Sequence, residues 1–168
     1  MDFVLQGFGV FLGVLAGTAV TLLTQWIIQK RSEAQTLKNL QFETELNIKK
    51  IDSWLEEITR YRNAVNGDVL ATYYGYFDLS RFIYPTANAM FLSGLLYKYL
   101  DHDGIGKLQV ITAEFSPFGE NYLNNQITQN KANFIKAKAV QEIDFWEKKF
   151  KGHRKSLEEI LGKLRQNK

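Results

Sequence analysis

The stretch that most constrains the fold of this chain is an uncharged run near the N-terminus. Residues 3–29 read FVLQGFGVFLGVLAGTAVTLLTQWIIQ, 27 positions without a charged side chain. As a helix this run would be roughly 40 Å long, more than the ~30 Å hydrocarbon core of a bilayer. We therefore expect a single transmembrane helix that spans with some tilt. Because the apolar core of a secretory signal peptide is only about 7 to 15 residues long, we expect the anchor to be retained.

Small residues recur at a regular spacing within this run. Gly9, Gly13, Gly17 and Thr21 are four residues apart, so a helix places them on one stripe. Such stripes let helix backbones approach closely in lipid, which predicts a homo-oligomer assembled through these four positions. The alternative is that the glycines reflect only the higher glycine frequency of membrane helices.

Basic residues follow the predicted span and do not precede it. Lys30, Arg31 and Lys38 come after the apolar run, and Asp2 comes before it. Cytoplasmic flanks carry an excess of Lys and Arg, so we expect the N-terminus outside and the remainder in the cytoplasm of a bacterial-type inner membrane. Trp26 occupies the position of an interfacial aromatic anchor.

After the span the pattern becomes that of an amphipathic helix. Apolar side chains alternate by three and four residues from residue 37 to residue 65. Since neither Gly nor Pro occurs between Leu22 and Asn66, the sequence predicts one continuous helix that ends at about residue 65. Its seam could pair with a second copy of the chain as a coiled coil, or with later helices of the same chain. The width of the apolar face favours the second arrangement. The apolar seam positions are Leu37, Ile48, Ile51, Leu55, Ile58 and Val65.

Prolines and glycines divide the rest of the chain into further helices. Pro85 is expected in the first turn of a helix whose body is residues 86–100. A final helix is expected to start between residues 120 and 126 and to run toward Leu164, with a bend or break at Gly152.

The segment DHDGIG at residues 101–106 resembles a cation-binding loop in composition only. Gly104 comes too early for a calcium loop, and the twelfth position is Thr112 instead of Glu. A helix stop near the glycines, with Asp103 capping a short helix through about Glu114, explains the same residues without a metal.

The expected fold class is therefore all-α. One N-terminal transmembrane helix, within residues 1–29, is followed by a cytoplasmic helical bundle, residues 30–168, with long first and last helices. The aromatic run at residues 73–77 is expected to pack in the core of this domain, although it could stack on a ligand base.

The sequence does not match the usual enzyme templates. It has no glycine-rich phosphate loop, no HExxH pair and no GxSxG elbow. It has two histidines and no cysteine, so neither a thiol nucleophile nor a thiolate metal site is available. We expect a protein that is not an enzyme and that has no metal or cofactor.

One basic cluster stands out near the C-terminus. Residues 131–168 hold 11 Lys and Arg against 5 Asp and Glu. Three interpretations remain open for the cluster: a solvated helix face, a contact with anionic lipid headgroups, or a site for a phosphate-bearing ligand or nucleic acid. The candidate anion-binding residues are Lys148, Lys149, Lys151, His153, Arg154 and Lys155.

The combination of a short membrane segment with a compact cytoplasmic domain is similar in layout to small membrane effectors of bacterial antiviral systems, including CRISPR-associated ones gated by cyclic oligonucleotides. This resemblance covers no diagnostic residues. It implies an oligomeric antiviral defence effector whose cytoplasmic domain senses a cyclic oligonucleotide or another polyanion and passes the change to the membrane helices. The alternative is a constitutive scaffold, or an accessory subunit of a larger membrane complex, that binds a protein partner.

Overall fold

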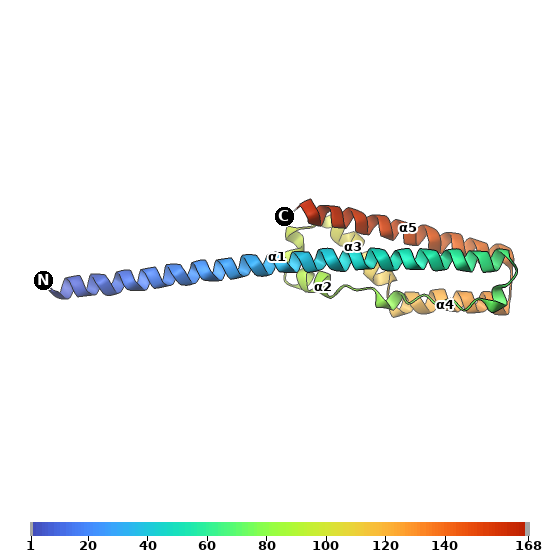
Figure 1. The fold of residues 1–168 in the computed structure, drawn as a ribbon, viewed down its shortest axis with the longest axis horizontal. Helices are drawn as coiled ribbons and strands as arrows, with labels where there is room; N and C mark the ends of the chain where they lie inside the picture. Colours follow the sequence, from blue (N-terminus) through green and yellow to red (C-terminus); the bar gives the residue numbers. More distant parts are fainter. Residues whose placement is uncertain (1, 167–168) are drawn as a thin grey trace. The chain divides into compact units, whose positions relative to one another are not determined.

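The computed structural model describes the backbone of residues 2–166 and the side chains of residues 13–166. The described chain is all-α and contains no strand, as predicted from the sequence (Figure 1). Its helices are α1 (Asp2–Asn66), α2 (Pro85–Leu92), α3 (His102–Glu114), α4 (Pro117–Ala132) and α5 (Lys136–Gln166). Three short 3-10 helices lie between α1 and α3: η1 (Leu70–Thr72), η2 (Leu79–Arg81) and η3 (Leu95–Lys98).

The prediction of one uninterrupted first helix is confirmed. α1 runs without a break to Asn66, and the chain then turns through Asp68, whose φ of 55° lies in the left-handed region. The structure divides into two compact units, with the boundary between Lys38 and Asn39. α1 contributes residues to both units.

In the first unit, every residue from 13 to 28 is exposed. Among the residues that the structure describes, no helix is both long enough and apolar enough to cross a membrane. The predicted span covers residues 3–29, and the side chains of residues 3–12, Gly9 among them, lie outside the described part.

In the second unit, α5 runs antiparallel to α1. Arg62 pairs with Glu147 at 2.5 Å, and further back along α1, Asp52 pairs with Arg154 at 2.6 Å. α3 also runs antiparallel to α5: Glu114, at the C-terminal end of α3, contacts Lys149, whereas Lys107, earlier on α3, contacts Glu159, later on α5. Figure 1 shows α5 alongside the second half of α1, with α4 also packed in this unit.

The core of the second unit is an aromatic cluster centred on Phe150, which is fully buried. Its ring centroid lies 5.7 Å from those of Trp54 and Trp146, 6.0 Å from that of Phe115 and 6.1 Å from that of Phe77. Trp54 lies on α1, and Trp146 and Phe150 lie on α5. Phe77 lies in the connection before α2, and Phe115 lies in the connection after α3. Such contacts add to the free energy of burial, which holds together elements distant in sequence.

The second half of the chain is divided differently from the prediction. The expected final helix is two helices, because Ser116 caps a new helix at Pro117 and the chain turns at residues 133–135. This turn lets α4 fold back against α5, where the Trp146 indole donates to Gln126 at 2.9 Å. The expected bend at Gly152 is wrong, since α5 continues through it.

The middle helix is also shorter than predicted. α2 ends at Leu92, and Gly94 adopts a φ of 78°, a conformation that glycine accepts without strain. The cap of α3 is Asp101, whose carboxylate accepts from the Gly104 amide at 2.9 Å, so the expected cap at Asp103 is wrong. Gly104 therefore lies inside α3 instead of ending a helix.

Side chains of helices hold the irregular segment between α1 and α2. The buried Asn47 side chain accepts from the Ile83 amide at 2.9 Å and donates to the Ile83 carbonyl. Asn124 of α4 makes the same pair of bonds to Phe77, at 3.0 and 2.8 Å. The side-chain amides of Asn47 and Asn124 thus satisfy the backbone N–H and C=O groups of Ile83 and Phe77, which lie outside any regular helix.

Candidate functional site

The predicted anion-binding residues lie on α5, and Glu114 of α3 neutralises two of them. Lys149 donates to one Glu114 oxygen at 2.8 Å, and the His153 ring lies 2.5 Å from the other. Burial raises the pKa of Glu114, but the hydrogen bonds from Lys149 and His153 outweigh it and lower that pKa overall. His153 also packs edge-on against Phe115. Lys149 and His153 therefore both tie α5 to α3.

Two further members of the cluster are paired with acidic side chains. Lys151 donates to Glu147 at 2.5 Å, one turn earlier on α5. Arg154 binds Asp52 of α1 and Glu158 of α5, each at 2.6 Å. The hydrogen bond that Arg154 donates to Asp52 raises the pKa of Arg154, in line with a permanently charged guanidinium.

The remaining two cations face solvent. Lys148 and Lys155 are exposed and have no ion-pair partner among the described residues. They are seven residues apart, which is two helical turns, so they share one outer face of α5 with the paired Lys151. The structure thus separates the cluster into four residues that contact carboxylates and two exposed lysines, Lys148 and Lys155, that do not.

His153 lines a shallow pocket between α3 and α5 that the sequence did not indicate. Its polar lining also includes His102, Lys107 and Ser156. Lys107 is already bound to Asp103 and Glu159, each at 2.8 Å, and these carboxylates raise its pKa. The pocket is therefore close to neutral, which argues against tight binding of an anion there.

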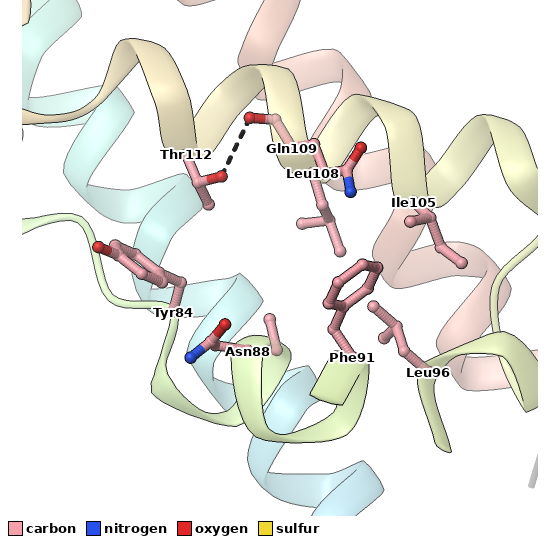
Figure 2. A pocket seen from close by; sticks show the side chains of 9 residues that line it. Tyr84, Asn88, Phe91, Leu96, Ile105, Leu108, Gln109 and Thr112 are labelled. Atoms are coloured by element: carbon pink, nitrogen blue, oxygen red, sulfur yellow. Dashed lines mark hydrogen bonds between the residues drawn. The ribbon is translucent and has the colours of Figure 1, made fainter. Parts of the chain in front are cut away.

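A second concave region, which we call the α2–α3 groove, is mainly apolar and encloses about 250 Å³. Figure 2 shows Phe91, Leu96, Ile105 and Leu108 gathered toward one end of it, with Tyr84, Asn88 and Thr112 at the other. The Thr112 hydroxyl is occupied by a hydrogen bond to the Gln109 carbonyl at 3.0 Å. The lining residues are Tyr84, Ala87, Asn88, Phe91, Leu96, Ile105, Leu108, Gln109 and Thr112.

The aromatic run at residues 73–77 is divided between core and surface. Phe77 is fully buried, and Tyr73 is buried with its hydroxyl donating to Glu57 at 2.7 Å. Burial, and then the bond to Glu57, raises the pKa of Tyr73 well above its usual value. Tyr74 and Tyr76 are exposed, by 86% and 61%.

The described part of the predicted oligomerisation stripe is open. A methyl group added at Gly13 or Gly17 would meet nothing within 4 Å. Thr21 lies on the same face and donates its hydroxyl to the Gly17 carbonyl at 2.9 Å. The stripe therefore has room for a closely packed neighbour.

The second unit is a helical domain with an aromatic core. Among the described residues, no group of three His, Asp or Glu side chains is arranged to hold a metal ion. Comparison with protein-family models, with curated proteins and with solved structures finds no match for this chain.

Proposed function

We propose that this chain is a single-pass, self-associating membrane protein that presents a helical domain to a protein partner in the cytoplasm and catalyses no reaction. The observation that supports the anchor best is the surface of residues 13–28. Every side chain there is exposed and uncharged, and eight are large hydrophobic groups exposed by 43% to 63%. A helix that is apolar on all sides is expected in lipid or in a protein core, and not in water.

The polar groups on this surface are compatible with lipid. Thr18, Thr21 and Thr24 each donate the side-chain hydroxyl to the backbone carbonyl four residues earlier, at 2.8 to 2.9 Å. A hydroxyl satisfied within its own helix costs little to bury in hydrocarbon. Threonines elsewhere in the chain make the same bond, so this feature permits a membrane location without requiring it.

The scaffold role is favoured over ligand sensing by the charge pairing on α5. Lys149, Lys151, His153 and Arg154 already contact carboxylates, and an anion would have to displace these partners. The pairs of Lys149, His153 and Arg154 join α5 to α3 or α1, which suits a rigid domain that holds a binding surface in place.

Self-association is tested by a pair of variants. Gly13→Ile adds a large side chain to the stripe, where the single chain has open space, so the isolated helix should tolerate it. The matched control is Ala19→Ile, which is exposed on the opposite face of the same helix. The mass in mild detergent should shift toward the monomer for Gly13→Ile and stay oligomeric for Ala19→Ile. An oligomer that is unchanged in both variants would remove the glycine stripe from the proposal.

A second candidate function is sensing of a polyanion such as a cyclic oligonucleotide. The exposed Lys148 and Lys155 favour it, because an oligomer would repeat these two lysines around its axis. Full-length protein titrated with a panel of nucleotides, including cyclic oligoadenylates, should then bind one of them. Lys148→Glu with Lys155→Glu should abolish that binding, whereas Lys49→Glu, an exposed lysine on α1, should not. Failure of the whole panel to bind would leave the scaffold role.

A further inference from the structure

The turn that joins α2 to α3 carries an apolar surface with the chemistry of a membrane interface. Residues 91–100 read FLSGLLYKYL and contain one lysine and no acidic residue. Leu92 is 76% exposed and Tyr97 is 61% exposed, whereas Leu96 and Leu100 are buried and hold the turn to the domain. The turn therefore directs one set of apolar side chains inward and a second set outward.

Local contacts hold the outward-facing side chains of this turn in place. Gly94 in the left-handed conformation reverses the chain, and η3 follows immediately. The Tyr97 ring packs against Phe91 with centroids 5.8 Å apart, and the Lys98 amine lies 5.6 Å from the Tyr99 ring. A leucine, tyrosines and a lysine on one exposed turn are the residues that membrane interfaces favour.

This turn lies at the end of the helical domain where α1 enters it. Glu43 of α1 accepts from the Thr86 amide at 2.8 Å, which places the start of α2 beside the beginning of the domain. On the far side of the turn, Asp101 binds Lys163 at 2.7 Å. Next to Lys163 on α5, the Leu164 carbonyl accepts from Gln41 of α1 at 2.8 Å. Both ends of the turn are therefore tied to this entry end.

The length of the connecting chain limits how far this end can lie from the bilayer. Gln41 lies 12 positions after Gln29, the last residue of the uncharged run, so at most roughly 40 Å of extended chain separates the two. The opposite end of the domain, near Asn66, lies another 25 residues of helix further along α1, roughly 38 Å. The chain therefore limits the distance from the anchor more tightly for the entry end than for the opposite end.

We infer that the turn at residues 91–100 rests in the lipid headgroup region, with Leu92 and Tyr97 inserted and Lys98 at the phosphates. This inference depends on the proposed membrane anchor. It gives the helical domain a second attachment to the bilayer, which would fix the orientation of the α2–α3 groove, since Phe91 and Leu96 line that groove.

The absence of cysteine from the chain permits a direct test. Single cysteines at Leu92, Ile135 and Val20 are labelled with an environment-sensitive fluorophore, and the full-length protein is reconstituted into phosphatidylcholine and phosphatidylglycerol vesicles. Quenching by nitroxide-bearing lipids is compared with quenching by aqueous iodide. Ile135 is the matched control, because it is apolar, 60% exposed and at the opposite end of the domain.

The inference predicts lipid quenching at position 92 that is several-fold stronger than at position 135, with iodide quenching in the reverse order. Equal behaviour at positions 92 and 135 would overturn it. Protection of position 92 from iodide without lipid quenching would also overturn it, and would assign the turn to a protein contact. The label at Val20 separates the two proposals: loss of lipid quenching there would contradict the anchor itself, whereas strong quenching at position 20 alone would refute only the inference about the turn.

Discussion

Glu43 should be among the acidic residues on which the helical domain depends most. It is 5% exposed, and its two carboxylate oxygens accept from the amides of Thr86 and Ala87 at 2.8 and 3.1 Å. These amides are the first free donors of α2, because Pro85 has no N–H and Tyr84 provides no side-chain cap. A helix of eight residues is too short to be stable alone, so it relies on this cap from α1.

The magnitude follows from the two bonds. Hydrogen bonds to a charged acceptor contribute about 1.5 to 3 kcal/mol each, and desolvation of the carboxylate offsets part of this. Glu43→Ala should therefore destabilise α2 by about 3 kcal/mol, which is about a hundredfold increase in local opening. Glu43→Gln should lose less, because the amide keeps one acceptor for one of the two N–H groups.

Hydrogen exchange of the full-length protein in detergent measures this directly. Amides of α2 should exchange about a hundredfold faster in Glu43→Ala, with little change in α5. The control is Glu45→Ala, which breaks a surface pair with Arg165 at 2.7 Å and should cost at most about 1 kcal/mol. Equal effects of the two alanine variants on α2 would refute the assignment of Glu43 as its cap.

Three further predictions concern the same domain. Phe150→Ala should destabilise it by about 3 to 5 kcal/mol, measured as a loss of thermal stability by near-ultraviolet circular dichroism, because it removes the centre of the aromatic core. Gly94→Ala should cost about 1 kcal/mol in the same assay, since its φ of 78° is unfavourable for a side chain. Acid should weaken the contact between α3 and α5: Lys149 and His153 lower the pKa of Glu114 below its ordinary value of 4.5, so its stabilising contribution is complete above that pH and is lost as the pH falls through the lowered pKa. Hydrogen exchange of α3 measured across this range would show no such change if Glu114 contributed nothing.

Local patterns predicted the elements that depend on local interactions. The absence of Gly and Pro and the seam from Leu37 to Val65 predicted the long α1, and Pro85 marked the start of α2 correctly. The division of the last helix was missed because the turn at residues 133–135 contains neither Gly nor Pro. Distant contacts hold the helix ends on both sides of that turn: Asn130 of α4 donates to the Tyr61 hydroxyl at 3.0 Å, and Lys136 of α5 donates to the Asn66 carbonyl at 3.1 Å.

The candidate site was predictable only in part for the same reason. The pairs of Lys151 with Glu147 and Arg154 with Glu158 have the four-residue spacing of helical ion pairs and can be read from the sequence. Glu114 is 35 residues from Lys149, so no local pattern predicts that it neutralises the cluster. The α2–α3 groove likewise depends on how α2 and α3 pack.

Alkaline carbonate extraction of membranes from cells that express the full-length chain tests whether the uncharged run lies in a bilayer. Carbonate removes proteins that adhere to a membrane surface and leaves those that span it. We expect the wild-type protein to stay in the membrane pellet and Val20→Glu with Leu23→Glu to release it, because charged groups inside a span cost several kcal/mol. Release of the wild-type protein by carbonate would show that the uncharged run does not span a bilayer.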